Sequence, residues 1–478
     1  MSSTNKAKSL SINKSSSSIP HVAKKAKSLS FNNSSSSIPH VANTSFIFFG
    51  CWNNINCSKK EKTLNRNVVL ALLKKLYSNM PIVLAGDNWY SQKIKLPATL
   101  QAANASTSEN KNKTIGKFKF YPVYVLETGY KKLFEISKKI DIVLGNHDIN
   151  PKKLNDFYAL NQCDQLGCMV KVQTDTISKM LGYKDPSSSS KPIQNIYQYN
   201  DVKLYVCKPH IEEKSKGIFF LYLNTNIFDA KDVNSIIEYR KLVIRELADK
   251  KIKLLFIVGH HPFFGLKKKK QKKTEGESTP KAEFIINTVA DLYFKETVDK
   301  DKVNAINQFL NIFTRYKSIY LCADIHNFQI CKLSSNLCMV ICGSGGASRD
   351  RLGDYVDNTV PIPLKCKLNN NIKVTDMYVH DSYGFSKITY SNSGNKVEIT
   401  YYKFVNTDIE YNIFKYTLEY FNKSWTVNKE APNKGESIIT DGDFNTATHC
   451  PKIRVEDKEN VDKLLATINH EKCGKKEK

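Results

Sequence analysis

The chain has 478 residues, 41% of them apolar, which is enough for one large folded domain or two ordinary ones. Its formal net charge is +26, from 72 lysines and arginines against 46 acidic residues. This excludes an acidic protein and favours anionic partners such as phosphate esters, nucleic acid or acidic surfaces. A nucleotide-composition bias in the source genome explains the many lysines and asparagines equally well.

The cysteine pattern and the lack of long apolar segments indicate the cellular compartment of the protein. Twelve cysteines are scattered from Cys51 to Cys473 without a CxxC pair, a pattern typical of a reducing compartment. The N-terminus lacks a secretory apolar segment, and the run Phe46–Phe49 is too short to cross a membrane. We therefore expect an intracellular, cytoplasmic protein without a membrane span. The composition would also suit a protein of a large DNA virus, in the virion or the host cytoplasm.

Residues 1–43 contain a direct repeat, in which 6–23 and 25–42 share a basic sequence with a run of serines. Such a segment has no apolar face and cannot bury enough surface to offset its ordering entropy. We expect a disordered basic tail. It is either a local duplication without function or a phosphorylated segment.

From residue 44 onward, short apolar runs alternate with helical patterns. The first elements expected are strands at Phe46–Phe49, Ile82–Ala85 and Ile142–Leu144, and helices over 62–78 and Leu126–Lys139. Residues 91–116 are polar and predict a long surface loop. Residues 150–215 are polar and broken by proline and serine, with short strands such as Val202–Val206.

The second half repeats the alternation and then becomes strand-rich. The expected elements are strands Ile218–Leu223, Leu254–Val258, Ile319–Cys322 and Met339–Cys342, helices Ile236–Leu247 and 303–313, and strands through Tyr402. This order predicts a mixed α/β sandwich rather than a purely parallel sheet. We expect the domain to span 44–405, with 406–478 as a charged C-terminal extension that has few strands.

Four of the expected strands run into turns that carry metal-ligand side chains. These turns are Gly86-Asp87, Gly145-Asn146-His147-Asp148, Gly259-His260-His261-Pro262 and Ala323-Asp324-Ile325-His326. Open α/β sheets place their sites just beyond the carboxyl ends of strands, so we expect these side chains to gather at one edge.

Taken singly, these residues also have plainer interpretations. Asp87 fits an ordinary turn, Tyr90 is one of 24 tyrosines, and one of His260 and His261 fits a packed loop. Cys51, after the first strand, is either a buried small apolar residue or a ligand. The lysine run over 267–273 is either a solvated loop or an attractant for anionic substrates.

The ordered set is more specific than its members. The motifs GDxxY at Gly86–Tyr90, GNHD at Gly145–Asp148, GHHP at Gly259–Pro262 and DxH at Asp324–His326 resemble the calcineurin-like metallophosphoesterase superfamily. GDxxY is similar to its purple acid phosphatase branch. The resemblance covers roughly 44–403, including the late glycine turn Gly343–Gly346 and the closing segment Tyr383–Phe385. It implies an αββα sandwich of two mixed β-sheets flanked by helices.

The resemblance also implies a reaction and its residues. It implies hydrolysis of phosphate monoesters by metal-bound hydroxide at a dinuclear site holding Fe, Mn or Zn, with a phosphorylated small molecule or phosphoprotein as substrate. The implied metal ligands are Asp87 as bridge, Asn146 and His260 at the divalent site, and Tyr90 and His326 at the ferric-type site. His147 would assist the leaving group and Asp148 would orient it. Substrate contacts are implied for Asn146, His147 and His261.

Two positions depart from the family pattern. Cys51 stands where the family has aspartate, and Asp324 stands where the last motif has histidine. Carboxylate oxygen suits Mn, Mg or Fe, whereas a thiolate suits Zn or Fe. The substrate-side histidine expected after GHHP has no match. Two alternatives therefore stay open: a catalytically degenerate phosphoesterase fold used as a binding module, or a basic structural or packaging protein that binds nucleic acid.

Overall fold

The computed structural model describes residues 43–54, 65–90, 92–94, 118–120, 122–149, 167–183, 194–229, 232–268, 284–286, 300–350, 364–365, 373–404 and 411–435. The chain divides into compact units after Val41, and all described residues lie in the second unit, Ala42–Lys478. The expected tail and most of the lysine run lie outside the described residues. In the described part of the chain, no helix is long and apolar enough to span a membrane.

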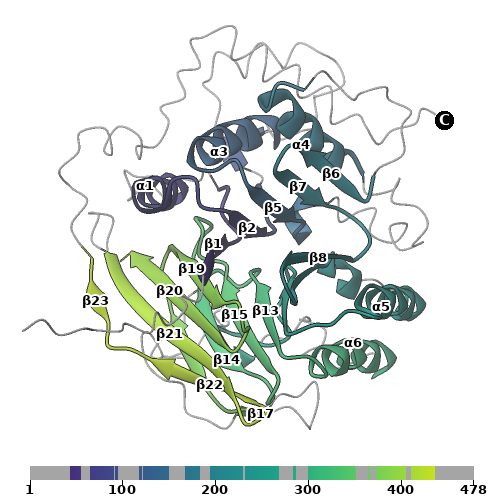
Figure 1. Ribbon diagram of the computed structural model, residues 1–478. Helices are drawn as coiled ribbons and strands as arrows, with labels where there is room; N and C mark the ends of the chain where they lie inside the picture. Colours follow the sequence, from purple (N-terminus) through teal and green to yellow (C-terminus); the bar gives the residue numbers. More distant parts are fainter. Residues whose placement is uncertain are drawn as a thin grey trace, which may run out of the picture. The chain divides into compact units, whose positions relative to one another are not determined.

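The larger sheet has ten strands in the order β22-β21-β20-β19-β1-β2-β5-β7-β6, with β23 beside β21 (Figure 1). Their bounds are β1 Asn43–Phe49, β2 Ile82–Ala85, β5 Ile140–Val143, β6 Ile196–Tyr199, β7 Val202–Tyr205, β19 Gly384–Ser391, β20 Lys396–Phe404, β21 Tyr411–Phe421, β22 Ser424–Lys429 and β23 Asn433–Lys434. The neighbouring strands β1, β2, β5 and β7 pair in parallel, whereas β6 is antiparallel to β7 and β19 through β22 pair antiparallel. The sheet is therefore mixed.

The smaller sheet has seven strands in the order β18-β14-β15-β13-β10-β9-β8. Their bounds are β8 His210–Ser215, β9 Ile218–Tyr222, β10 Leu254–Val258, β13 Ser318–Cys322, β14 Phe328–Lys332, β15 Leu337–Cys342 and β18 Met377–His380. The four strands β9, β10, β13 and β15 run parallel, and β8, β14 and β18 are antiparallel to their neighbours. Parallel strands are covered on both faces, which explains their nearly continuous apolar sequences.

Helices connect the parallel strands. Their bounds are α1 Asn65–Tyr77, α3 Pro122–Ile136, α4 Gly167–Met180, α5 Val233–Leu247 and α6 Lys300–Phe313. Apolar side chains of α1 and α3 belong to the core of the larger sheet, and those of α5 and α6 pack on the smaller sheet. Figure 1 shows α5 and α6 side by side, with α5 next to β8.

Aromatic rings join the two sheets. Phe46 of β1 contacts Phe220 of β9 and Phe256 of β10, with ring centroids 5.3 and 5.6 Å apart. Tyr390 of β19 packs on the same Phe256 ring at 5.3 Å. The sheets thus share an apolar core, with helices outside each of them. The predicted α/β sandwich of two mixed sheets flanked by helices is confirmed.

Three parts of the chain differ from the expected elements. Gln92–Ile94, at the start of the expected loop 91–116, forms β3, which pairs with β4 (Phe118–Phe120), and residues 95–116 lie outside the described residues. The polar stretch 150–215 contains α4, whose inner face includes the buried polar side chains of Gln173 and Thr174 and so lacks an apolar stripe. Beyond residue 405, β21 and β22 extend the larger sheet, with β21 paired along β20 from Phe404–Tyr411 to Lys396–Glu419.

Two further pairs of short strands are antiparallel, and one of the described cysteines is oxidised. The strands β11 (Leu266–Lys268) and β12 (Phe284–Ile286) pair with each other, as do β16 (Leu364–Lys365) and β17 (Lys373–Val374). Cys207 is disulfide-bonded, which departs from the expectation of reduced cysteines. The free buried thiols among the described residues are Cys51, Cys322, Cys331, Cys338 and Cys342.

Candidate metal centre

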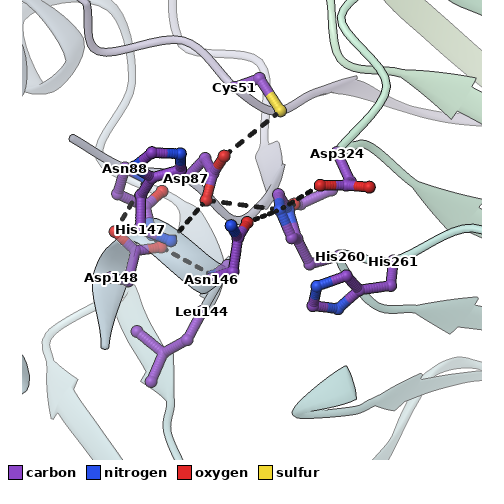
Figure 2. Close-up of polar contacts among 12 residues, drawn as sticks. Cys51, Asp87, Asn88, Leu144, Asn146, His147, Asp148, His260, His261 and Asp324 are labelled. Atoms are coloured by element: carbon purple, nitrogen blue, oxygen red, sulfur yellow. Dashed lines mark hydrogen bonds and ion pairs between the residues drawn. The ribbon is translucent and has the colours of Figure 1, made fainter. Parts of the chain in front are cut away.

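The ligand-type residues lie together where strands of both sheets end. Cys51, Asp87 and Asn146 follow β1, β2 and β5 of the larger sheet, and His260 and Asp324 follow β10 and β13 of the smaller sheet (Figure 2). Backbone hydrogen bonds tie these loops in pairs. The N–H of Cys51 donates to Gly86 O (3.0 Å), and the N–H of Ala323 donates to His260 O (2.9 Å).

Three of these residues have a left-handed backbone, with φ of 51° at Cys51, 53° at Asp87 and 55° at Asp324. This conformation costs a non-glycine residue on the order of 1–2 kcal/mol. Aspartate tolerates it better than most residues, whereas cysteine does not share that preference. Strained backbone of this kind persists where the surrounding structure fixes it and is concentrated at functional sites.

Two glycines allow the loops to approach. A Cβ atom on Gly145 would lie 2.3 Å from Asp87 N and 2.4 Å from Asp87 Oδ1. A Cβ on Gly86, whose φ is +82°, would lie 2.7 Å from His260 Nδ1. Any side chain at either position would therefore push the ligand-bearing loops apart.

One set of donors surrounds Cys51, and we call Cys51, Asp87, Tyr90 and His326 the Cys51 group. Asp87 Oδ2 lies 3.8 Å from Cys51 Sγ and accepts a hydrogen bond from the Tyr90 hydroxyl at 2.8 Å. The same hydroxyl lies 3.1 Å from His326 Nε2. Cys51, Asp87 and His326 satisfy the distances required of ligands to one metal ion.

A second set surrounds His260, and we call Asn146, His260, His261 and Asp324 the His260 group. His260 Nε2 lies 3.0 Å from Asn146 Oδ1 and 3.7 Å from Asp324 Oδ1. It also lies 3.3 Å from Oδ1 of Asp87, the carboxylate oxygen that does not face Cys51. His260, His261 and Asp324 offer ligand atoms close enough for one ion.

The imidazole orientations fit cation binding. His260 Nδ1 donates to Ala85 O, and His326 Nδ1 donates to Ser348 O, both at 2.6 Å. In a neutral ring this leaves Nε2 with a lone pair that faces the cluster, as in metal-ligating histidines. His260 Nε2 then faces the oxygens of Asp87 and Asp324. A cation bound between these atoms would balance the negative charge of the two carboxylates. The residues present therefore fit a metal site.

His261 is held by a residue that the sequence did not single out. Thr225 Oγ1 accepts the backbone N–H groups of His260 and His261 and lies 3.0 Å from His261 Nδ1. Because that oxygen already accepts two hydrogen bonds, its own proton points to Nδ1. Tyr320 donates its hydroxyl to His261 O at 2.6 Å. Thr225 lies three residues beyond the end of β9, and no motif spacing marks it.

His147 is the exposed member of the site. Its backbone N–H donates to Asp87 Oδ1 at 3.0 Å, and its ring lies 4.5 Å from that of Tyr90. The other ligand-type side chains are buried or half-buried. His147 is therefore placed where a substrate from solvent would meet it.

Asp148 does not orient His147, contrary to the expectation. Its carboxylate accepts the backbone N–H groups of Gly145 (2.7 Å) and Asn88 (2.9 Å) and the side-chain amide of Asn88 (3.0 Å). Within the described residues, no hydrogen bond joins Asp148 to the His147 ring. The physical reason is that Asp148 is fully buried under the loop, whereas the ring of His147 is exposed.

Burial and charge move the pKa values of these groups in different directions. Burial alone would raise the pKa of Asp87, but the charges of His260 and His147 and the His147 N–H outweigh it and lower it. Burial and the charge of Asp87 raise the pKa of Asp148, of the Cys51 thiol and of the Tyr90 hydroxyl. Without a cation, Cys51 and Tyr90 are thus neutral donors around an ionised Asp87.

Comparisons with solved structures give several likenesses, two of which are described here. No protein-family model and no curated protein matches the sequence. A single mutant of Vps29 from Entamoeba histolytica is 7% identical with a TM-score of 0.23, covering 82% of this chain and 100% of its own. The calcineurin-like phosphoesterase YfkN from Bacillus subtilis is 13% identical with a TM-score of 0.27, covering 91% and 99%. Likenesses this low decide neither family nor activity.

Proposed function

We propose that this chain is a calcineurin-like metallophosphoesterase that hydrolyses phosphate monoesters. The observation that carries the proposal is the position of Asp87 between two donor groups. Its Oδ2 faces Cys51 and Tyr90 of the Cys51 group, and its Oδ1 faces His260 of the His260 group. This is the arrangement that a carboxylate bridging two cations requires.

The two groups would hold the metal ions, the Cys51 group one ion and the His260 group with Asp87 the other. Metal ions bound there would supply a water of lowered pKa and neutralise charge on the phosphoryl oxygens. Within the superfamily, the contacts of the Tyr90 hydroxyl with Asp87 and His326 favour the purple acid phosphatase branch.

The chain's own residues bind the ester and handle its proton. His147, exposed and backed by the Tyr90 ring, would donate a ring N–H proton to the ester oxygen that leaves. Its backbone N–H keeps Asp87 Oδ1 directed at His260. Asp148 fixes the loop that carries Asn146 and His147 through Gly145 N. His261, tied to Thr225 and close to Asp324, would contact the substrate at the edge of the metal centre.

A binding module without turnover is the second candidate. It is favoured by the hydrogen bond of the Tyr90 hydroxyl to Asp87, because these groups satisfy each other without a metal ion. It is also favoured by the raised pKa of the buried Cys51 thiol, since a thiol must lose its proton to become a ligand. This candidate predicts at most one tightly bound metal ion.

Metal stoichiometry of the Asp87→Asn variant separates the candidates. Elemental analysis of the dialysed wild-type protein should find two metal ions per chain, and the variant should hold at most one and lose turnover. Full metal content and full activity in Asp87→Asn would rule out the bridging role. Substitution of Glu238, which forms an exposed pair with Lys241 on α5, gives a matched control for loss of a carboxylate.

A further inference from the structure

We propose that the two halves of the site select different cations, and that the Cys51 group takes a borderline-soft divalent ion of the zinc type through the sulfur of Cys51. The harder half is the His260 group, which offers only oxygen and nitrogen. This inference rests on the proposed dinuclear site and goes beyond it, because it assigns the class of ion and a sulfur ligand to one half.

The donor chemistry of the Cys51 group supports this selection. It combines a thiol sulfur, a carboxylate oxygen, a phenol oxygen and an imidazole nitrogen. Zinc accepts sulfur, nitrogen and oxygen together, usually as four tetrahedral ligands, whereas magnesium and calcium take oxygen. Thiolate sulfur therefore shifts the preference of this half away from hard ions.

The distances are near those of a tetrahedral site. Bonds of about 2.3 Å to sulfur and about 2.0 Å to oxygen or nitrogen place tetrahedral donors roughly 3.3–3.5 Å apart. Cys51 Sγ lies 3.8 Å from Asp87 Oδ2, and the Tyr90 hydroxyl lies 3.1 Å from His326 Nε2. The ligand atoms of Cys51, Asp87 and His326 all lie within 4.8 Å of one another, so these three residues are close enough to share one ion.

The environment of Cys51 differs from that of a packed structural cysteine. Its sulfur faces a carboxylate in a turn with φ of 51°, directly beyond β1 (Figure 2). Cys338 is buried in the same apolar core cluster as Cys51, but it lies within β15, and no carboxylate contact of its sulfur is found among the described residues. The turn that places Cys51 is also held to the neighbouring sheet, since Ala347 N donates to Cys51 O at 2.9 Å.

His326 completes the ligand set from the opposite sheet. Its Nδ1 donates to Ser348 O, and its backbone N–H donates to Asp350 Oδ2 at 3.0 Å. Both contacts fix the ring with Nε2 towards Tyr90. Binding of the ion replaces the thiol proton of Cys51, which leaves to the buffer, so one proton is released from this residue.

Cobalt(II) is the probe for the test, because it takes zinc sites and reports sulfur ligation by absorption. Metal-stripped full-length protein is titrated with cobalt in the absence of air, and the near-ultraviolet sulfur-to-cobalt charge-transfer band is recorded. Wild-type protein should show the band, saturating at one cobalt per chain. Cys51→Ser and Cys51→Asp should lose it, whereas Cys338→Ser should keep it.

Competition then tests selectivity. Zinc should remove the wild-type band, and a large excess of magnesium should leave it. In Cys51→Asp, which restores a hard ligand, the preference for zinc over manganese should fall at least about tenfold. Far-ultraviolet circular dichroism of each variant shows that the fold is retained.

The outcomes that overturn the proposal are distinct. Cobalt binding without a sulfur band would overturn it while leaving an oxygen–nitrogen metal site, and hence the proposed function, in place. A band that persists in both Cys51 variants would assign the sulfur to another cysteine and also overturn it. Absence of any cobalt binding by the wild-type protein would overturn the inference and the metal-dependent function together.

Discussion

Asp87 and Asp148 are both buried at neighbouring strand ends, yet their pKa values move in opposite directions. Burial would raise both, but the histidine charges around Asp87 lower its pKa, whereas the charge of Asp87 adds to the effect of burial on Asp148. The carboxylate of Asp87, beyond β2, thus faces the donor groups. The carboxylate of Asp148, beyond β5, faces backbone N–H groups instead.

Removing the Asp148 carboxylate should destabilise the fold. In Asp148→Ala the N–H groups of Gly145 and Asn88 lose their acceptor, and each buried unsatisfied donor costs about 1–3 kcal/mol. The free energy of unfolding from urea denaturation should fall by about that amount or more. Asp148→Asn, which keeps one acceptor oxygen, should lose less. Equal stability of Asp148→Ala and wild type would contradict this structural role.

Replacing His147 should slow turnover and leave metal content unchanged. The ring of His147 is exposed, and only its backbone N–H contacts Asp87, so His147→Ala keeps the metal ligands in place. Loss of a general acid typically lowers the rate about 10²–10⁴-fold. Steady-state kinetics with an aryl phosphate measure the loss, and elemental analysis checks the metals. A smaller loss for esters with a better leaving group would further support proton donation; unchanged rates would exclude it.

Thr225 should matter for metal affinity through the turn that it holds. Thr225→Val removes the acceptor of two backbone N–H groups and the donor to His261 Nδ1. Disturbing the groups that orient a ligand typically costs about 10–100-fold in metal affinity. Thr225→Ser, which keeps the hydroxyl, should restore it. Competition with a chelator measures both, and equal affinities of the valine and serine variants would count against this role.

A half-buried charge network on β7 and β8 should make stability depend on pH. Glu212 on β8 bonds Lys203 and Lys214, each at 2.7 Å, and Tyr205 at 2.8 Å, with its side chain 17% exposed. Burial alone would raise its pKa, but hydrogen bonds from His210, Lys203 and Lys214 outweigh it and lower the pKa below the ordinary 4.5.

The direction of this pH dependence follows from the linkage between proton binding and folding. Because the folded pKa of Glu212 is depressed, its stabilisation is complete above the unfolded pKa and is lost as the pH falls through the folded pKa. Glu212→Gln should lower the free energy of unfolding by about 1–3 kcal/mol at pH 7, and the difference from wild type should shrink below about pH 4. Glu238→Gln, at an exposed pair, is the control and should change little. A difference that grows at acid pH would contradict the argument.

The sequence predicted the core strands and the convergence of the ligand-type residues well, for a physical reason. Strands such as β2 and β10 are covered on both faces, so they read as apolar runs that end at a glycine. Parallel strands end at one edge of a sheet, so the side chains of Asp87 and Asn146 meet beyond β2 and β5 of the larger sheet. His260 reaches them from β10 of the smaller sheet, a meeting of two sheets that the strand pattern alone did not predict.

Other features could not be predicted because their signals are weak in a single sequence. Helix α4 buries Gln173, whose amide oxygen accepts the Tyr130 hydroxyl, so polarity hides the helical stripe. In β21, by contrast, Phe414, Tyr416 and Leu418 alternate with less buried positions. This period of two is typical of a strand and could have been recognised in the sequence. The direction of the Asp148 carboxylate depends on tertiary contacts that no motif records.

The most direct test of the central claim is hydrolysis of an aryl phosphate by metal-stripped protein before and after reloading with manganese, zinc or iron. The donor groups that share Asp87 predict no turnover without metal and restored turnover after reloading, to a maximum at two ions per chain. Turnover that is unaffected by stripping, or absent with every metal although two ions bind, would contradict a metal-dependent phosphoesterase.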